Sequence, residues 1–408
     1  MYYNKIEWMM GMSFLKKVKT KIRNNIPAGR RYIDKKIQVY NQRFIELQNN
    51  VNDNKNKISE LNKKIDSLES KIELQNKIIN DYIKENKAND ERQKELANLE
   101  WQAKGKSTWV IKTPIPNNEY KQFWGEYHYA SSLKKYLERL GIYVLIDNRE
   151  NIYDGINADV VLVLRGKRYY TPDRRNKKCK YIMWNICHPS EIEDEEYELY
   201  DAVCVASYNY SKVLKNKISV PIFPLLQCTD TELFYLVENN KRKKYGYIFV
   251  GNTRNAKRDC VNWAIENKVN LKVWGREWEK QFQNYKDFVV DEAVPNDKLP
   301  YLYRDSKVTF NDHWEDMKEH SFINNRTFDA LACGLPIISD YVLELEELFG
   351  DVVLCYKNKE EFLECIEKVN KNYKNIKRKV DEVWPLIKEK YSFKARAKEL
   401  IEIVDKIK

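Results

Sequence analysis

The sequence predicts an α/β protein in which two parallel-sheet domains face a cleft, preceded by a long N-terminal coiled-coil helix. Two observations predict the domains: short apolar strand-like runs alternate with helical segments on both sides of a polar stretch at residues 241–246, a pattern typical of parallel sheets covered by helices. A seven-residue apolar repeat over residues 37–82 predicts the coiled coil. The expected order is a basic leader, a coiled coil, two α/β domains and a closing helix, at residues 1–36, 37–100, 101–240, 241–390 and 391–408.

The leader carries most of the chain's positive charge. Residues 1–36 hold ten Lys or Arg against Glu7 and Asp34, which is +8 of a net +11. One helical stripe of the leader is apolar and consists of Phe14, Leu15, Val18, Ile22 and Ile26. A basic amphipathic helix suits the surface of an anionic membrane, and the alternative is a basic helix that packs on its own protein or is partly disordered. Because the rest of the chain is nearly neutral, nucleic-acid binding is not expected.

Cysteine usage and hydropathy indicate a cytoplasmic protein, which the leader would hold at the inner face of the membrane. No apolar run approaches the roughly 20 residues of a membrane span, and no signal peptide is visible. The eight cysteines form no C-x-x-C pair and fall mostly in apolar runs, which is typical of reduced core residues. The four histidines lack metal-ligand spacing to one another or to cysteine, so no metal site is expected.

Residues 37–82 contain the clearest local pattern. The first apolar heptad position is filled by Ile37, Phe44, Val51, Ile58, Ile65, Ile72 and Ile79, and the second by Tyr40, Leu47, Asn54, Leu61, Leu68, Gln75 and Tyr82. Ile at the first position with Leu at the second favours a parallel dimer, and Asn54 and Gln75 would fix its register. A long single helix packed on a domain is the alternative. Seven repeats favour a homodimer with a rod of roughly 70 Å. The repeat ends at Asn86 and Asn89, and a polar helical tail reaches Trp101.

Both α/β domains follow from apolar runs of strand length. In the first domain these runs are Thr108–Ile111, Tyr143–Ile146, Val160–Leu164, Tyr181–Trp184 and Ala202–Ala206, with the plainest helix at Tyr129–Leu140. In the second domain they are Tyr247–Val250, Leu271–Trp274, Phe288–Val290, Val308–Asn311, Ile337–Ser339 and Val352–Cys355. Ligands of such sheets bind beyond the carboxyl ends of the strands.

The segment Ser321–Asp340, SFINNRTFDALACGLPIISD, holds the strongest functional pattern in the chain. A polar opening with Asn325, Arg326 and Thr327 precedes an apolar helical run, which a Gly ends before a short buried strand. Asp329 lies three residues after Arg326, so both side chains project from one face of the helix. A helix N-terminus beside an Arg suits a phosphate, and an Asp suits a sugar hydroxyl. The pair therefore suits a nucleoside diphosphate, and a solvated Arg–Asp pair on an ordinary amphipathic helix is the alternative.

This segment resembles the C-terminal signature of GT-B glycosyltransferases, in particular the group that includes CgeB-like spore-maturation proteins. The residues that match the pattern N-x-R-x-F-E/D-A-x-A-C-G-x-x-x-x-x-D are Asn324, Arg326, Phe328, Asp329, Ala330, Ala332, Cys333, Gly334 and Asp340. The resemblance covers roughly Trp101 to Lys408 and implies two Rossmann-like domains, the first for the acceptor and the second for a nucleotide-sugar donor. Many retaining members carry Glu eight residues before the acidic position. Because Ser321 stands there and Asp329 replaces the usual Glu, both stereochemical outcomes stay open.

The first strand of the second domain leads into FVGNTRNAKRD (249–259), which resembles the Gly-plus-basic turn at the donor pyrophosphate of GT-B enzymes. Gly251 permits a tight turn, and Asn252 and Thr253 could cap a helix beginning there. Arg254 and Arg258 would lie near the start of that helix, where cations are unfavourable unless an anion is bound. We therefore expect a diphosphate at this turn, with solvated surface charge as the alternative.

Two loops of the first domain carry candidate catalytic residues. The loop at 114–132 brings Glu126 and His128 to the start of a helix, and in GT-B enzymes this loop faces the acceptor. Either side chain could remove the proton of an acceptor hydroxyl, and a capping or packing role is the alternative for His128. His188 directly follows a strand and precedes Pro189. We expect His188 to line the donor sugar, with a structural role as the alternative.

The sequence therefore predicts a glycosyltransferase that moves a sugar from a nucleotide-diphosphate donor to a glycan, lipid-linked or other surface-polymer acceptor. Arg326 and Arg258 would hold the diphosphate and Asp329 the ribose hydroxyls, with no cofactor or catalytic metal. Residues 274–278 and 291–300 resemble the edges of the nucleobase pocket. Two alternatives are a nucleotide-sugar epimerase of the same fold and a non-catalytic coiled-coil scaffold with a transferase-like domain.

Overall fold

The computed structural model describes residues 16–17, 20, 30–118, 121–149, 153, 157–237, 243–254 and 256–407. The chain divides into two units, Met1–Lys87 and Ala88–Lys408, which are described separately. The apolar stripe expected in the leader lies wholly outside the described residues. Within the described residues, no helix is both long and apolar enough to cross a membrane.

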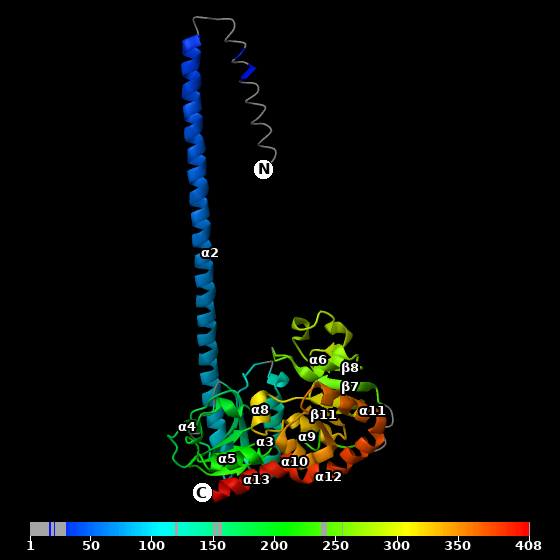
Figure 1. Ribbon diagram of the computed structural model, residues 1–408. Helices are drawn as coiled ribbons and strands as arrows, with labels where there is room; N and C mark the ends of the chain where they lie inside the picture. Colours follow the sequence, from blue (N-terminus) through cyan, green and yellow to red (C-terminus); the bar gives the residue numbers. More distant parts are fainter. Residues whose placement is uncertain are drawn as a thin grey trace. The chain divides into compact units, whose positions relative to one another are not determined.

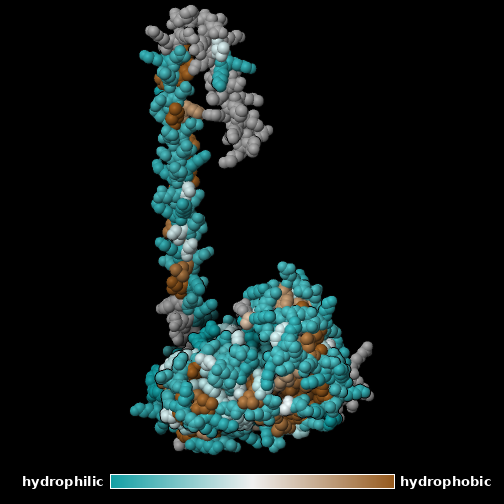
Figure 2. All heavy atoms as spheres, viewed as in Figure 1, coloured by the Kyte–Doolittle hydropathy of each residue, from teal (hydrophilic) through white to brown (hydrophobic). Residues whose placement is uncertain are grey.

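The first unit consists mainly of the long helix α2 (Arg30–Gln102), whose last turns belong to the second unit. The helix contains no Gly or Pro, and its polar sequence is rich in residues with high helix propensity. Its apolar heptad side chains remain exposed, for example Leu47 at 62%, Leu61 at 58% and Leu68 at 57%. Figure 2 shows brown apolar side chains at intervals along the otherwise teal helix. The expected long N-terminal helix is thus confirmed, and its association with a second copy stays a prediction.

The first lobe is built on a parallel six-stranded sheet in the order β2-β1-β3-β4-β5-β6. Its strands are β1 (Thr108–Lys112), β2 (Tyr143–Asp147), β3 (Val160–Arg165), β4 (Lys180–Asn185), β5 (Ala202–Val205) and β6 (Ile222–Pro224). Its helices are η1 (Lys121–Phe123), α3 (Gly125–Arg139), η2 (Pro189–Glu191), α4 (Asp194–Tyr197) and α5 (Tyr208–Lys215). Of the four interior strands, β1, β3 and β5 are buried along their whole length, which explains their continuous apolar sequences.

The second lobe repeats this architecture with the order β12-β11-β10-β7-β8-β9, again all parallel. Its strands are β7 (Tyr245–Val250), β8 (Leu271–Trp274), β9 (Val289–Asp291), β10 (Ser306–Asn311), β11 (Ile337–Asp340) and β12 (Val353–Tyr356). Its helices are α6 (Asp259–Glu266), η3 (Trp278–Lys280), η4 (Tyr285–Asp287), α7 (Leu299–Arg304), α8 (Glu315–Glu319), α9 (Asn325–Ala332), α10 (Leu343–Phe349), η5 (Gly350–Val352), α11 (Lys359–Glu382) and α12 (Trp384–Lys390).

The last helix, α13 (Phe393–Lys406), returns to the first lobe (Figure 1). It packs against α3 and contributes Phe393, Ala397 and Leu400 to the first lobe's apolar core. Conversely, the second lobe contributes Phe322 to an apolar core of the first lobe. Glu344 of α10 also crosses between lobes and accepts hydrogen bonds from the Ser207 hydroxyl (2.8 Å) and two backbone N–H groups at the start of α5. The two lobes therefore share buried contacts.

The predicted fold class of two parallel α/β domains preceded by a long helix is confirmed. Every strand expected from the sequence is present within a residue or two of its expected bounds. Only β6 was not expected, because its three residues end in a Pro and follow another Pro, and Pro lowers strand propensity.

Candidate functional site

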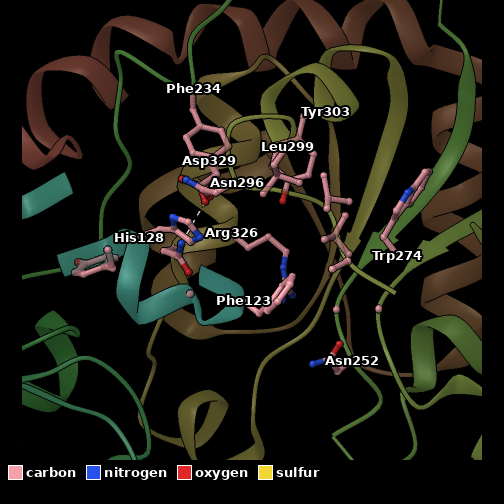
Figure 3. Close-up of a pocket in the computed structure, with 18 of the residues that line it drawn as sticks. Phe123, His128, Phe234, Asn252, Trp274, Asn296, Leu299, Tyr303, Arg326 and Asp329 are labelled. Carbon is pink, nitrogen blue, oxygen red and sulfur yellow. Dashed lines mark hydrogen bonds between the residues drawn. The ribbon is translucent and has the colours of Figure 1, made fainter. Parts of the chain in front are cut away.

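A cavity of about 370 Å³ lies between the two lobes (Figure 3). The second lobe lines it with the carboxyl ends of β7 and β8 and the start of α9, and the first lobe with the start of α3. In the second sheet, β7 has β8 on one side and β10 on the other, so the chain order reverses at this point. Open α/β sheets bind ligands at such a reversal, beyond the carboxyl ends of the strands.

Helix α9 presents Arg326 to the cavity from a tightly bonded N-terminus. Asn324 is the N-cap, and its Oδ1 accepts a hydrogen bond from the N–H of Thr327 (3.2 Å). The N–H of Asn325 donates to Oε1 of Gln227 (2.9 Å), and the side chain of Arg326 donates to Oδ1 of Asn311 (3.3 Å). Because two amide groups of the first turn are already bonded within the protein, an anion here would depend on side chains more than the sequence suggested.

His313 and Asp340 support the start of α9 from behind. Nδ1 of His313 lies 2.6 Å from Oδ1 of Asp340, and Nε2 accepts the backbone N–H of Asn324 (3.2 Å). This pairing fixes the ring with its proton on Nδ1. Burial alone would raise the pKa of Asp340, but the interactions with His313 outweigh it and lower that pKa. The final Asp of the sequence signature therefore positions the helix N-cap.

Arg258 is the most unusual side chain at the cavity, because it is only 3% exposed yet incompletely bonded. Its Nε lies 2.8 Å from Oδ2 of Asp312. None of Nε, Nη1 and Nη2 has a hydrogen-bond partner within the described part of the chain, and neither does Oδ1 of Asp312. A buried guanidinium without partners is costly. The guanidinium therefore has hydrogen-bonding capacity that the described residues do not use.

Two further arginines converge on the same wall. Burial, together with the charges of Arg258 and Arg326, lowers the pKa of Arg254 to about 9. Arg254 has a left-handed backbone (φ 60°), and its guanidinium lies 4.3 Å from the ring of Trp314. Three mutually repelling cations around one cavity are stabilised when an anion binds among them. The electrostatics therefore favour a multiply charged anion.

The glycine turn allows the backbones of two loops to approach each other. Gly275 has φ +158°, and a Cβ there would lie 2.0 Å from the carbonyl oxygen of Gly251. Asn252 bridges the same loops, since its Oδ1 accepts the N–H of Arg276 (2.8 Å). The expectation that a helix begins at Asn252 is therefore wrong: residues 251–254 and 256–258 are not helical, and α6 begins only at Asp259.

Asp329 lies one turn beyond Arg326 and also lines the cavity. Its Oδ1 accepts a hydrogen bond from the hydroxyl of Thr229 (2.6 Å), and its Oδ2 accepts one from the side-chain amide of Asn325 (3.2 Å). Burial raises the pKa of Asp329 to about 7, partly offset by Thr229 and Arg326. Each oxygen keeps a further lone pair, so the carboxylate could still accept a ligand hydroxyl.

The first-lobe candidates fall in different places. His128 lines the cavity, and its Nε2 lies 2.7 Å from the carbonyl oxygen of Gln122. Since a carbonyl only accepts, Nε2 carries the proton, and Nδ1 of a neutral ring is left as a base. Glu126 is absent from the described lining, and burial raises its pKa. Glu126 is thus further from the expected reaction space than His128.

His188 lies at another contact between the lobes. It is 5% exposed with a left-handed backbone (φ 51°). Its Nδ1 lies 3.5 Å from Glu191 and 3.6 Å from Asp316, and its ring lies 5.1 Å from that of Trp314. Burial lowers its pKa. His188 is not among the described residues that line the cavity, and its contacts are those of a residue that joins the lobes.

The structure brings most of the predicted donor residues together. Those that line the cavity are Gly251, Asn252, Arg254, Arg258, Asn325, Arg326 and Asp329. Thr327 is buried behind the wall, where its hydroxyl bonds Asn324 and Asn311. The lining residues that sequence reasoning missed include Cys228, Asp230, Phe234, Tyr303 and Phe393. Most come from the connection between the lobes and from core-like apolar runs, which carry no pattern of their own.

The described residues contain neither a cluster of potential metal ligands nor a disulfide. Nowhere among them do three or more His, Cys, Asp or Glu side chains gather as potential metal ligands. All eight cysteines fall within the described residues and none forms a disulfide.

Comparison with known proteins bears on the fold of the two lobes. Residues 254–402 match the family model of glycosyl transferase-like proteins. Sucrose-phosphate synthase from Thermosynechococcus elongatus is similar over 74% of this chain and 99% of its own (TM-score 0.57, 11% identity). An alpha-glucosyltransferase in complex with UDP and a DNA 13-mer covers 74% and 100% (TM-score 0.55, 10% identity). Trehalose 6-phosphate synthase from Burkholderia multivorans covers 74% and 99% (TM-score 0.54, 8% identity).

No curated protein sequence matches the chain. The chain therefore contains a glycosyl transferase-like domain, and its two lobes have the GT-B fold.

Proposed function

We propose that this protein is a glycosyltransferase that moves a glycosyl group from a nucleotide-diphosphate donor to a glycan or other surface-polymer acceptor without a metal. The observation that carries the proposal is the buried guanidinium of Arg258, a residue that lines the interlobe cavity and whose side-chain nitrogens have no hydrogen-bond partner among the described residues. A diphosphate supplies the multiple acceptors that this group lacks, and Arg pairs well with phosphate oxygens. UDP, the ligand in the structure of a similar alpha-glucosyltransferase, has this chemistry.

The donor would lie along the second-lobe wall. Arg258 and Arg326 would hold the diphosphate, and Arg254 would add a third positive charge. Gly251 would let the phosphates approach the backbone, with Asn252 beside them. The ribose would reach Asp329 and Asn325, with Thr327 keeping the N-cap in place. The nucleobase would lie against Trp274 and Leu299, which also line the cavity (Figure 3).

Catalysis would rest on stabilising the leaving group. Negative charge grows on the diphosphate as the glycosidic bond breaks, and fixed cations in a cavity with little water stabilise that charge before it forms. The arginines would take the part that a divalent cation takes elsewhere. We propose His128 as the base for the acceptor hydroxyl, because Nδ1 is its free acceptor and it lies at the cavity. Glu126 and His188 remain secondary candidates for this step.

A nucleotide screen tests the donor proposal. UDP-, GDP-, ADP- and dTDP-sugars are added to the full chain, and the melting temperature is measured with and without EDTA. One class should raise the melting temperature in both conditions, and calorimetry should then give a single site per chain. The same donor should be consumed when acceptor is supplied. If no nucleotide binds, the scaffold alternative holds, and if EDTA abolishes binding, the metal-independent mechanism is wrong.

We further propose that α2 forms a parallel homodimer and that the leader binds an anionic membrane at its cytoplasmic face. The exposed stripe on α2 supports the dimer, since apolar side chains at heptad spacing are stabilised by a second helix. The double variant Ile65→Asp/Ile72→Asp should convert dimer to monomer in light scattering. Ser67→Asp/Ser70→Asp adds the same charge off the stripe and should stay dimeric. A monomeric wild type would contradict the proposal.

Membrane attachment has its own test. The full chain should sediment with vesicles of phosphatidylglycerol and remain free with vesicles of phosphatidylcholine, because basic segments are attracted to anionic headgroups. Equal binding to both would contradict an electrostatic attachment.

A further inference from the structure

A second cavity, of about 310 Å³, lies entirely within the first lobe. It is formed by the carboxyl ends of β1 and β3 and by the segments that follow β2 and β3. In this sheet β1 has β2 on one side and β3 on the other, so the chain order reverses here as it does at the interlobe cavity. Its position is therefore the one at which open α/β sheets bind ligands.

The charges at this first-lobe cavity are unbalanced. Arg149 and Arg168 both line it and are exposed, and neither side chain has an ion pair or hydrogen bond within the described part of the chain. Its other charged side chains are already paired: Lys112 with buried Asp147, and Asp173 with Arg175. Two unneutralised guanidinium groups therefore face one cavity, a composition that favours phosphate or carboxylate oxygens.

Aromatic side chains complete the wall. Tyr169 is 53% exposed. Tyr170 is held in place, because its carbonyl accepts the hydroxyl hydrogen of Tyr200 (2.9 Å) and its ring lies 5.0 Å from Nζ of Lys112. Apolar and aromatic walls with a few polar groups are typical of small-molecule sites. The cavity thus offers ring faces beside its cations.

Cations also connect this cavity to the interlobe site. Lys167 precedes Arg168, and its Nζ lies 4.6 Å from the ring of Trp314. The guanidinium of Arg254, which lines the interlobe cavity, lies 4.3 Å from the same ring. A ligand with anionic groups along its length could therefore contact Arg168, then Lys167, then Arg254 between the first-lobe cavity and the interlobe cavity.

We propose that the first-lobe cavity binds an anionic group of the acceptor, so that the acceptor is a sugar polymer bearing phosphate or carboxylate groups. This inference rests on the proposed transferase function. Arg149 and Arg168 would bind the anion, and the tyrosines would contact the adjoining sugar ring. The bound acceptor would extend past Lys167 toward the interlobe cavity.

Saturation-transfer NMR on the full chain tests this with glucose 1-phosphate, glucuronate and glucose as probes. The interlobe cavity is first saturated with the nucleoside diphosphate that stabilises the protein most, so that its arginines are occupied. We expect one or both anionic sugars to bind and glucose to give no signal. Arg149→Gln/Arg168→Gln should weaken the binding by at least about tenfold, since the variant loses a charge-assisted hydrogen bond to the anion at each position. Binding of only one probe would identify the anion as phosphate or carboxylate.

Lys177→Gln/Lys178→Gln is the matched control, because it removes two exposed charges of the same lobe that do not line the cavity. This control should bind the probes like the wild type. Equal signals from glucose and the anionic sugars, or unchanged binding by Arg149→Gln/Arg168→Gln, would overturn the inference. The melting shift with nucleoside diphosphate is recorded on the same samples. If the wild type shows no melting shift with any nucleoside diphosphate but still binds the anionic sugars, the proposed function is wrong and the anion site remains.

Discussion

Two buried cation–carboxylate pairs at the carboxyl edges of the sheets, Lys112–Asp147 in the first lobe and Arg258–Asp312 in the second, differ in how completely they are bonded. In the first lobe, the ammonium of Lys112 bonds both Asp147 and the carbonyl of Tyr153, and Asp147 also accepts the N–H of Tyr153 (2.9 Å). In the second lobe, Nε of Arg258 lies 2.8 Å from Oδ2 of Asp312, but none of the three side-chain nitrogens of Arg258 has a hydrogen-bond partner among the described residues. Oδ1 of Asp312 also lacks a hydrogen bond and lies 4.0 Å from Nη1 of Arg326. We call the first pair closed, because its polar atoms are hydrogen-bonded within the protein, and the second open, because its hydrogen bonding is incomplete.

The difference separates a structural role from a binding role. A buried pair stabilises a fold only when its remaining hydrogen-bonding groups are satisfied, and Lys112–Asp147 meets that condition. Arg258–Asp312 does not, and it lies against a cavity that holds two more arginines. Incomplete bonding of a buried charge, more than charge itself, therefore distinguishes the candidate site in this protein.

The largest effect is expected for Lys112→Met, which leaves Asp147 buried without its cation. Breaking such a pair costs about 3–5 kcal/mol, so the midpoint of urea unfolding should fall sharply. Nucleotide affinity, measured where the variant stays folded, should remain within about twofold because the sites are separate. Lys178→Met, at an exposed position, should change stability by no more than about 0.5 kcal/mol. An unchanged midpoint for Lys112→Met would show that the pair is not structural.

Arg326→Ala should give the largest loss of activity. The side chain is 21% exposed and makes one hydrogen bond, to Asn311, so the fold should remain intact. Turnover should fall by about 10²–10³, as for the loss of one preorganised donor to a developing negative charge. Arg378→Ala, on the exposed face of α11, is the control and should keep wild-type rates. Wild-type turnover by Arg326→Ala, with circular dichroism showing a native fold, would reject the donor-site assignment.

Arg258→Met/Asp312→Asn removes the open pair with little change in volume. Replacing a poorly satisfied buried pair is often neutral or stabilising, so the unliganded protein should melt at the wild-type temperature or above. Nucleotide affinity should fall by about 100-fold, because two hydrogen bonds to a charged ligand are lost. Calorimetry and thermal melting measure both quantities. If the variant binds nucleotide like the wild type, the Arg258–Asp312 pair has no binding role, and incomplete bonding does not distinguish it from Lys112–Asp147.

The sequence predicted the sheets well because the strands are buried apolar runs and the connections are short. It also singled out Arg326, Asp329 and Arg258, which line the interlobe cavity, since a helix start and a glycine turn leave local patterns. It could not show that Arg258 is buried beside Asp312 with incomplete hydrogen bonding, because Asp312 lies 54 positions away along the chain. Nor could it show that the α9 amide groups are bonded by Gln227, which the fold brings from another segment. Long-range pairing therefore decides the chemistry of this site.

Asp329→Asn tests the pH dependence of the second-lobe site. Because burial raises the pKa of Asp329 to about 7, its stabilising contribution is complete below about pH 4 and is lost as the pH rises through 7. Asp329→Asn lacks this titration, so it should exceed the wild type in unfolding free energy by about 1–2 kcal/mol at pH 8 and match it at pH 4. Nucleotide affinity of the wild type should rise over the same range, since the carboxylate accepts the ribose hydroxyls. Parallel pH profiles for both proteins would contradict this.

The smallest effect is expected for Gly251→Ala. A Cβ there would lie 3.2 Å from Nη2 of Arg258 and 3.1 Å from Cε1 of Phe249, so the guanidinium must shift by a few tenths of an ångström. We expect nucleotide affinity to fall threefold to tenfold, about 1 kcal/mol. Gly246→Ala, at the other end of β7, meets the carbonyl oxygen of Asn270 at a similar 3.2 Å. It should therefore cost comparable stability with no loss of affinity. Equal affinity losses in both variants would mean that the open pair tolerates displacement and that its geometry does not set the donor affinity.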